Sequence, residues 1–398
     1  MASRLQDVEE SEYEFIASQY RSFAKISLKE REFLYASVCS GAADDPFLVS
    51  LLGSAPRSQR RPNIVLAAVH FLLLRGARSP LASYYPSVVA WRGEQSPPEG
   101  TVVDEVDRFS LDTQSLVGEQ VKHANHFAVF RSFCEEYEEE LRALVSTRAT
   151  QTNEVGRCAG LLPALQIVGN DTTRPLSLVD LGSSAGLNLL FDHYAYDYGG
   201  AHLEGEMTSS VRVKCEVLDG NISNVTVPSI SRRVGIDREP IDLCDEQQAL
   251  WLLACQWPHD LERFDRLRAA IELAKELPDR VSLIAGELIE VLPDVALASH
   301  ADTHLCVMNT WVGAYLSVEQ QRSLRDTMTR ISRDRQVSWL YAESPYEVPG
   351  FEVPPAPDGV NIKGSTALVL DNIERGRHAP RRLADMHPHG KWIHWWDR

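Results

Sequence analysis

Residues 177–190 read SLVDLGSSAGLNLL and decide the fold of the chain. An apolar run ends at Asp180, a turn rich in glycine and serine follows, and apolar residues then recur at helical spacing as far as about Tyr194. This pattern predicts a strand, a tight turn and a helix. Three chemistries use such a unit: a nucleotide-type ligand held at the helix N-terminus, a dinucleotide site with G-x-G-x-x-G, and a serine hydrolase with G-x-S-x-G.

Length and charge limit the possible partners. The chain has 398 residues, 44% of them hydrophobic, enough for two domains or for one large α/β domain with an appendage. A formal net charge of −16 repels phosphate backbones and anionic lipids, so we expect no nucleic-acid or membrane partner. The seven cysteines form no C-x-x-C pair, which favours free thiols over disulfides or a metal site. The acidic start MASRLQDVEESEYEF lacks a secretory apolar segment, so we expect a cytoplasmic protein.

Residues 1–150 are expected to form an all-helical N-terminal domain. Apolar residues recur there at helical spacing, and prolines separate several short helices. The longest of these helices is expected to run from near His123 to Ser146, and its acidic stretch EEYEEE is typical of a solvated face.

Residues 151–398 are expected to form a Rossmann-like α/β domain. Short apolar runs alternate with helical patterns after Leu176, which predicts a doubly wound, parallel sheet. Residues near 198–230 alternate in polarity and are expected to form an inserted β-hairpin. The other expected strands are 178–181, 233–236, 281–285, 304–308, 337–342 and a closing pair, 366–370 with 391–395.

Polar residues follow four of the expected strands, namely Asp237, Glu287, Asn309 and Glu343. In a doubly wound sheet the carboxyl ends of the strands meet at one edge, where ligands bind. A simple alternative is that strand ends meet solvent and therefore carry polar side chains. The sequence predicts a ligand site at this edge.

The hydrolase and dinucleotide interpretations each lack a required part. A nucleophile elbow follows several core strands and an upstream oxyanion loop, whereas everything before Leu178 has a helical pattern. The late histidines could still complete a triad with Ser184: His378, His387, His389 and His394. The dinucleotide pattern lacks its third glycine, because Leu187 stands at that position.

The segment DLGSSAG (180–186) resembles the first motif of class I S-adenosylmethionine-dependent methyltransferases, with Ser184 where the middle glycine is expected. The resemblance implies a seven-stranded Rossmann-like sheet whose last strand is antiparallel. It also implies that an acid ending the second strand binds the ribose hydroxyls and that a polar group ending the third binds adenine. Asp237 and Glu287 stand in these places, and the insertion explains why Asp237 lies 55 residues after Gly182 rather than about 20. The implied cofactor-binding residues are Asp180, Gly182, Ser184, Gly186, Asp237, Glu287 and Asn309.

Four further segments resemble an uncharacterised bacterial family known as a domain of unknown function: QTNEVGR (151–157), FDHYAYDYG (191–199), GID (235–237) and WLLACQWP (251–258). The first is expected to be helical. Glu154 and Arg157 would then form a surface ion pair worth about 0.3 kcal/mol. Alternatively, this helix is a lid whose Asn153 and Glu154 face the cofactor.

We therefore expect an S-adenosylmethionine-dependent enzyme that transfers a methyl group to a small molecule. Such displacement needs a base only when the acceptor carries a proton, and the candidate bases are Glu343, Tyr346 and His193. Alkyl transfer or cyclisation on the same sulfonium would leave the same sequence features. A non-catalytic nucleoside-binding regulator is a further alternative, because N-T-W-V (309–312) replaces the D/N-P-P-[YF] motif of many amino-nitrogen methyltransferases.

Overall fold

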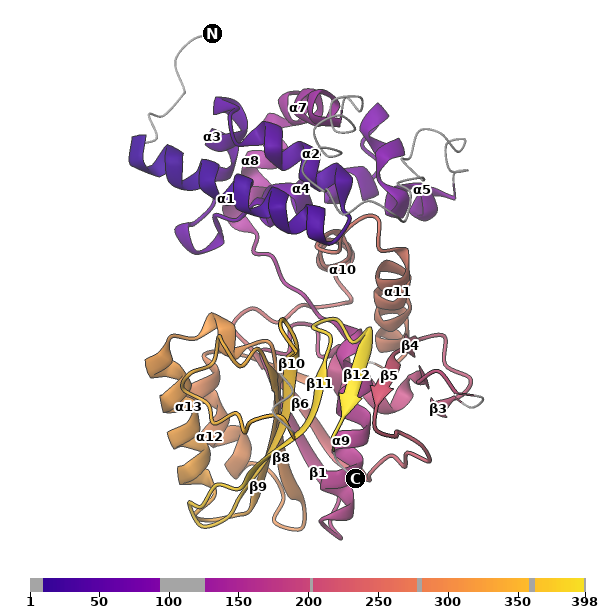
Figure 1. Cartoon of the computed structure of the whole chain (residues 1–398), viewed down its shortest axis with the longest axis vertical. Helices are drawn as coiled ribbons and strands as arrows, with labels where there is room; N and C mark the ends of the chain where they lie inside the picture. The colour runs from indigo at the N-terminus through magenta and orange to yellow at the C-terminus, as the bar shows by residue number, and fades with distance from the viewer. Residues whose placement is uncertain (1–9, 94–125, 201–202, 278–280, 358–361, 397–398) are drawn as a thin grey trace. The chain divides into compact units, whose positions relative to one another are not determined.

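The structure is a computed structural model that describes residues 10–93, 126–200, 203–277, 281–357 and 362–396 (Figure 1). The chain divides into two compact units: Met1–Thr152 with Leu250–Phe264, and Asn153–Ala249 with Asp265–Arg398. The first unit is helical. It also includes Leu250–Phe264, from the second half of the chain. No change of composition in the sequence indicates that this segment joins the helical unit.

The helical unit packs around α4 (Pro62–Leu74), of which all residues but Asn63 are buried. The one polar side chain buried in α4, His70, lies 3.0 Å from the Ala254 carbonyl through Nδ1 and 2.8 Å from Ser87 Oγ through Nε2. Burial lowers the pKa of His70 to about 4, so the ring is neutral and joins the returning segment to α4. The other helices are α1 (Glu10–Lys29), α2 (Phe33–Ala42), α3 (Pro46–Gly53), η1 (Arg57–Gln59), η2 (Pro80–Tyr84), α5 (Pro86–Arg92), α7 (His126–Glu136) and α8 (Glu138–Thr147).

The single helix expected from His123 to Ser146 is two helices. The first residues of that range lie outside the described residues, and α7 and α8 are separated at Tyr137, whose φ of −108° and ψ of 26° leave the helical region. The Tyr137 ring stacks on Phe133 with centroids 4.6 Å apart. This packing contact has no counterpart in the hydrophobic pattern, so the break was not predictable.

The second unit is built on a nine-stranded sheet with the order β5-β12-β11-β10-β9-β8-β1-β6-β7. Strands β7, β6, β1, β8 and β9 are mutually parallel, and β10, β11 and β12 continue from β9 as an antiparallel meander. The strands are β1 (Leu176–Leu181), β5 (Glu216–Asp219), β6 (Ile230–Asp237), β7 (Ser282–Ala285), β8 (His304–Thr310), β9 (Val337–Glu343), β10 (Thr366–Ile373), β11 (Pro380–Met386) and β12 (Trp392–Trp395).

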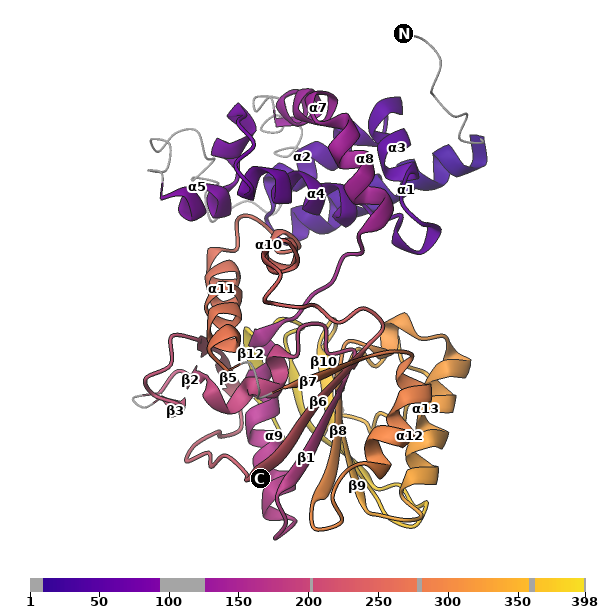
Figure 2. The same ribbon diagram turned by 180° about the vertical axis from the view of Figure 1, so that it is seen from behind.

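Helices cover both faces of this sheet (Figures 1 and 2). On one face, α12 (Leu288–Leu297) and α13 (Val318–Ile331) pack over a buried apolar cluster that includes Val307, Val337 and Trp339. On the other face lies α9 (Cys158–Asn170). Two more helices, α10 (Glu246–Ala254) and α11 (Leu261–Glu276), each continue from one unit into the other.

Three sequence-based expectations about the sheet are wrong. The main sheet has nine described strands rather than seven, because β5 and β11 also join it. The closing strands β10 and β12 do not pair, since β11 lies between them. The expected hairpin near 198–230 does not form either: β4 (Arg212–Lys214) pairs with β2 (Ala195–Asp197) beside β3 (Glu204–Gly205), whereas β5 pairs with β12. The partner of β5 lies far away in sequence, so local alternation does not identify it.

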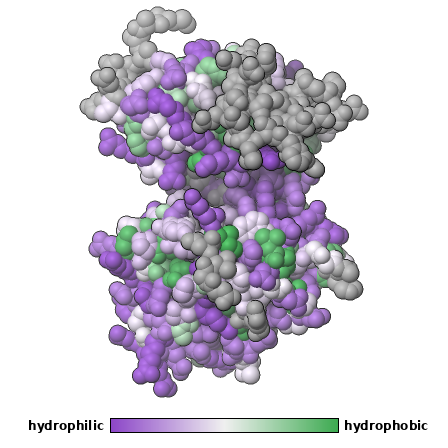
Figure 3. Space-filling model, viewed as in Figure 1, coloured by the Kyte–Doolittle hydropathy of each residue, from purple (hydrophilic) through white to green (hydrophobic). Residues whose placement is uncertain are grey.

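The segment after the turn also differs from the expected helix, because η4 (Leu187–His193) is a 3-10 helix kinked at Leu190. Hydrophilic side chains predominate on the face seen in Figure 3, with hydrophobic ones in separate small patches. No helix within the described ranges is long and apolar enough to cross a membrane. Nor do three or more histidine, cysteine, aspartate or glutamate side chains gather there as a metal site would require.

Candidate functional site

The candidate site lies at the carboxyl edge of the parallel strands. The chain leaves β1 to form β6 on one side and later returns to form β8 on the other. In doubly wound proteins, ligands bind at the carboxyl ends of the strands where the connections diverge in this way, which here is the edge at β1 and β8. The turn after β1, the ends of β6, β8 and β9, and the loops that follow therefore form the candidate site.

The turn after β1 has a left-handed backbone at three positions. Gly182, Ser184 and Gly186 have φ angles of +67°, +54° and +74°. A Cβ atom at Gly182 would lie 2.4 Å from Val312 Cγ2, and one at Gly186 would lie 2.8 Å from Val281 Cγ1. Both glycines are therefore required by their conformation and by their neighbours.

Ser184 tolerates the left-handed conformation because its backbone N–H donates a 2.8 Å hydrogen bond to Asp237 Oδ2. The other carboxylate oxygen, Oδ1, accepts from the Glu239 amide at 3.0 Å. A carboxylate offers about four acceptor positions, so the partly exposed Asp237 keeps capacity for further donors. The structure thus places the expected second-strand acid directly beside the turn.

Asp180 is buried one residue before the end of β1. Burial raises the pKa of its carboxyl to about 8; the Asp237 carboxylate adds to this rise, and the Arg157 guanidinium opposes it. Asp180 is therefore mostly protonated at neutral pH and can donate a hydrogen bond there.

The segment 151–157 braces the turn, although it is not the expected helix. Residues 151–154 are non-helical, and the first helical residues are those of η3 (Val155–Arg157), which Glu154 caps by accepting from the Gly156 amide. Asn153 Oδ1 accepts from the Leu187 amide at 3.0 Å, so Asn153 does reach the turn. Glu154 Oε1 lies 3.2 Å from Arg266 Nη2, and Oε2 lies 3.2 Å from His389 Nδ1.

A second cluster joins the ends of β8 and β9. The fully buried Asn309 accepts from Trp339 Nε1 at 2.7 Å and donates to Glu343 Oε1 at 2.6 Å. The same Glu343 oxygen accepts from the amides of Val312 and Gly313 at 2.9 and 3.0 Å. Asn309 was expected to contact cofactor, but the structure gives its side chain to Trp339 and Glu343.

The environment of Glu343 shifts its titration. Burial raises the pKa of the carboxyl to about 7; the donors of Gly313, Val312 and Asn309 oppose the rise, as does the nearby Arg157 guanidinium. Arg157 is itself buried and donates to the Thr310 carbonyl at 3.1 Å and to the Pro388 carbonyl at 3.0 Å. One buried cation thus acts on both buried acids, Asp180 and Glu343.

The pleat of the sheet separates the two clusters. Asp180 pairs with Gly235, and side chains alternate along a strand, so Asp180 and Asp237 share one face. Asn309 pairs with Leu181 and with Tyr341, which places Asn309 and Glu343 on the opposite face. The edge therefore has two halves, one over β1 and β6 and the other over β8 and β9.

The remaining candidates lie at less enclosed positions. Glu287 is exposed and forms an ion pair with Arg238 at 2.8 Å. Tyr346, after β9, is 68% exposed. His193 Nε2 lies 3.7 Å from Asp192, whose carboxylate pairs with Arg233 in the middle of β6, so these contacts hold His193 away from the strand ends.

The hydrolase interpretation finds no support in the geometry. Ser184 Oγ is buried and has no hydrogen-bond partner in the described part of the chain. The His378 ring instead contacts Asp371 at 2.6 Å and Thr329 at 2.8 Å. A nucleophilic serine needs a base within hydrogen-bond reach, and no such contact forms among the described residues.

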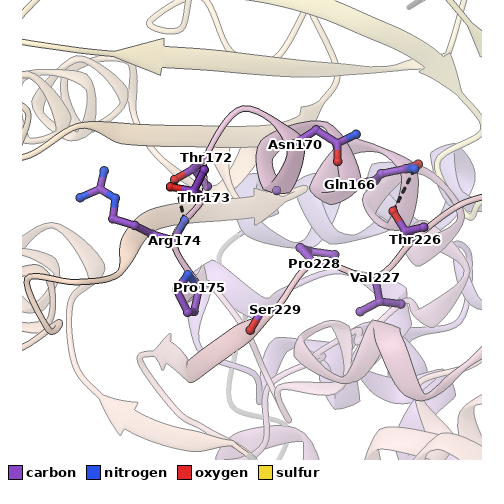
Figure 4. Close-up of a pocket in the computed structure, with 11 residues that line it drawn as sticks. Gln166, Asn170, Thr172, Thr173, Arg174, Pro175, Thr226, Val227, Pro228 and Ser229 are labelled. Carbon is purple, nitrogen blue, oxygen red and sulfur yellow. Dashed lines mark hydrogen bonds between the residues drawn. The ribbon is translucent and has the colours of Figure 1, made fainter.

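A hollow of about 340 Å³ lies elsewhere, at the amino ends of β1 and β6 (Figure 4). Gln166 and Asn170 of α9 face it, together with the loop before β1 and residues 226–229 before β6. Its described lining contains one exposed cation, Arg174, and no carboxylate, histidine or cysteine. The groups suited to chemistry are those of the carboxyl edge, so we assign the candidate site to that edge and not to this hollow.

Sequence reasoning missed the groups that hold Glu343. The amides of Val312 and Gly313 and the indole of Trp339 carry no motif, and their roles arise from folding alone. The central place of Arg157 was also missed, although its position in a polar segment before the first strand was a usable signal.

A protein-family model described as "Uncharacterized protein conserved in bacteria (DUF2332)" matches residues 17–114 and 114–395. No curated protein matches the chain. Among solved structures, a crystal structure of WbdD matches with 13% sequence identity and a TM-score of 0.25. The match covers 56% of this chain and 36% of that one, so this chain spans about a third of the WbdD chain; at this TM-score the likeness carries no argument.

Replacing Glu343 with glutamine should change how stability depends on pH. The folded pKa of about 7 lies above the ordinary 4.5, so the folded chain binds the proton more tightly and stability falls as pH rises between these values. The free energy of unfolding of wild type minus that of Glu343→Gln should therefore decrease by on the order of 3 kcal/mol from pH 4.5 to pH 8. Denaturant titrations at both pH values measure it. The control is Glu347→Gln, at an exposed position. If the free energies of unfolding of wild type and Glu343→Gln change equally with pH, the raised pKa of Glu343 is wrong.

Replacing Ser184 with glycine should stabilise the chain. A non-glycine residue in the left-handed region costs about 1–2 kcal/mol, and glycine removes that cost while keeping the N–H that bonds Asp237. Because glycine also loses more entropy on folding, we expect a net gain of about 0.5–1 kcal/mol, measured by urea unfolding. Ser184→Val should lower stability. A stabilising valine would show that the turn is not left-handed.

Proposed function

The chain belongs to a family of uncharacterized proteins conserved in bacteria (DUF2332), and we propose that it is an S-adenosylmethionine-dependent enzyme that transfers a methyl group to a small molecule. One observation carries the proposal. At the strand ends beside β1, the Asp237 carboxylate closes onto a left-handed glycine-rich turn, and it keeps acceptor positions for further donors. A nucleoside with two ribose hydroxyls suits such a carboxylate, and the turn without Cβ atoms at Gly182 and Gly186 admits close approach.

The described residues fit this group in chemical terms. Asp237 would accept the ribose hydroxyls, and the backbone of residues 182–186 would contact the chain that bears the sulfonium. Asp180, mostly protonated, would be a donor at the end of β1. Asn153 would hold the turn by its bond to Leu187. When bound, the cofactor supplies an electrophilic methyl group, and the protein orients the acceptor in line with it and excludes water.

S-adenosylhomocysteine should raise the melting temperature of the protein. A ligand that binds only the folded state stabilises it by mass action, by about 2.7 kcal/mol at 100 times its dissociation constant. Thermal unfolding with and without the compound measures this, and adenosine alone serves as a weaker-binding comparison. If neither S-adenosylhomocysteine nor S-adenosylmethionine shifts the transition, the cofactor proposal is wrong.

Asp237→Asn should weaken S-adenosylhomocysteine binding by at least about tenfold. Hydrogen bonds to a charged group are worth about 1.5–3 kcal/mol each, and asparagine removes the charge while keeping an acceptor for the Ser184 amide. Titration calorimetry measures the loss.

The controls for Asp237 are Asp219→Asn and Asp242→Asn. Both residues are exposed carboxylates that each accept one backbone amide, from Gly220 and Cys244 respectively, and neither lies at the turn. Equal losses in all three variants would point to general damage. A loss confined to Asp219→Asn would place the ribose-binding acid on β5.

A further inference from the structure

The carboxyl group of Glu343 is bonded very unevenly. Its Oε1 accepts three hydrogen bonds, from the Asn309 side chain and from the amides of Val312 and Gly313. Its Oε2 is buried and has no partner in the described part of the chain. A buried polar atom without a partner carries a substantial free-energy cost, so it needs an explanation in its function.

Holding the loop after β8 does not require this second oxygen. A glutamine in the same place would offer one carbonyl oxygen to the same three donors. A glutamate adds the ability to hold and release a proton, which has to reside on Oε2 because Oε1 is saturated by donors. The three donors also fix the orientation of the carboxyl, so Oε2 has a defined direction.

We propose that Glu343 is the catalytic base of this site, and that its Oε2 takes the proton lost by an amine acceptor when that amine is methylated. This inference rests on the proposed function. In the step, the nitrogen lone pair forms the new N–C bond, and the methyl–sulfur bond breaks with its electron pair going to sulfur. The acceptor nitrogen loses one proton to Glu343 Oε2, so the products are the methylated amine, the neutral thioether and a protonated carboxyl.

Glu343 and the proposed cofactor site lie at different strands of the same sheet edge. Asp237 and the turn occupy the half of the edge over β1 and β6, and Glu343 occupies the half over β8 and β9. Since β1 and β8 are neighbours, an acceptor over β8 and β9 lies beside a donor over β1. Strands β1 and β8 lie between β6 and β9, so Asp237 and Glu343 are about three strand spacings of about 4.8 Å apart, and the bound cofactor would have to extend across β1 to bridge that gap.

The chemistry of proton transfer favours an amine. Aliphatic ammonium groups have pKa values of about 10.4, whereas hydroxyls of the water type lie near 15.7. Because the pKa of Glu343 is raised to about 7, an ammonium is within its range and an aliphatic hydroxyl is not. An ionised Glu343 would also attract the cationic form, which favours an amine over an uncharged phenol of similar pKa.

The surroundings also suit a cationic acceptor. Tyr315 follows β8 and Tyr346 follows β9, and each is 68% exposed. Exposed aromatic rings are suited to ammonium groups, which bind their faces through cation–π attraction. These two residues would supply the outer walls for the amine.

The loop after β8 covers the carboxyl. A Cβ atom at the buried Gly313 would lie 3.3 Å from Glu343 Cδ, whereas the next two residues, Ala314 and Tyr315, are exposed. An acceptor would reach Oε2 by displacing Ala314 and Tyr315 alone, because Val312 and Gly313 have to stay bonded to Oε1 to keep the carboxyl in its orientation.

The test uses the full-length wild-type protein and Glu343→Gln, with Glu347→Gln as a matched surface control. S-adenosylmethionine is supplied together with a bacterial small-metabolite extract that has been separated on a cation exchanger into amine-containing and amine-free fractions. A second portion of the amine fraction is treated with acetic anhydride, which blocks its amines. Formation of S-adenosylhomocysteine is measured, and its binding to each variant is determined by calorimetry.

We expect turnover with the amine fraction alone and loss of turnover after acetylation. Glu343→Gln should bind S-adenosylhomocysteine within about threefold of wild type yet turn over at least 100-fold more slowly, as expected for loss of a general base. Glu347→Gln should match wild type. Retained activity in Glu343→Gln, turnover only with the amine-free fraction, or binding without turnover in any fraction would each overturn the inference and leave the cofactor proposal standing. Absence of S-adenosylhomocysteine binding in wild type would instead overturn the proposed function.

Discussion

The hydrogen bond from the Ser184 amide to the Asp237 carboxylate fixes the functional edge of the sheet. It offsets the left-handed strain at Ser184, because a bond to a charged acceptor is worth about 1.5–3 kcal/mol and the strain costs about 1–2. The same bond ties the end of β6 to the turn after β1, so two neighbouring strand ends keep one geometry. Asn153 extends this arrangement by accepting from Leu187, where η4 begins. A serine at the middle position of the turn is therefore compatible with the conformation that glycine would otherwise supply.

In the other half of the edge a carboxylate also accepts backbone amides, but it is more deeply buried. Glu343 holds the loop after β8 as Asp237 holds the turn after β1, in both cases through a carboxylate oxygen that accepts backbone amides. The difference lies in exposure: Asp237 is partly exposed, whereas Glu343 is fully buried and its pKa is raised to about 7. A carboxyl group thus provides a charged acceptor in one half and a proton-holding group in the other, and the environment sets the roles.

Features that depend on neighbouring residues could be predicted from the sequence, and those that depend on distant partners could not. Strand β1 and its turn follow from local pattern, and α13 begins at a capping box formed by Ser317 and Gln320. Strand β11 was missed because PRRLADM has a polar pattern, and it becomes a strand only by pairing with β10 and β12. In the candidate site, acids at strand ends were foreseeable. The hydrogen bonds that Asn309 makes with Trp339 and Glu343 were not, because those contacts join β8 to β9 only after folding.

The two halves of the edge share a buried cation. Arg157 lowers the pKa of both Asp180 and Glu343, while burial raises these pKa values to about 8 and about 7. The other groups that act on each acid are separate. The Asp237 carboxylate raises the pKa of Asp180 further, whereas the donors of Gly313, Val312 and Asn309 lower that of Glu343. The proton affinity of each acid is therefore set mainly by its own half of the edge, and Arg157 is the influence that the two acids have in common.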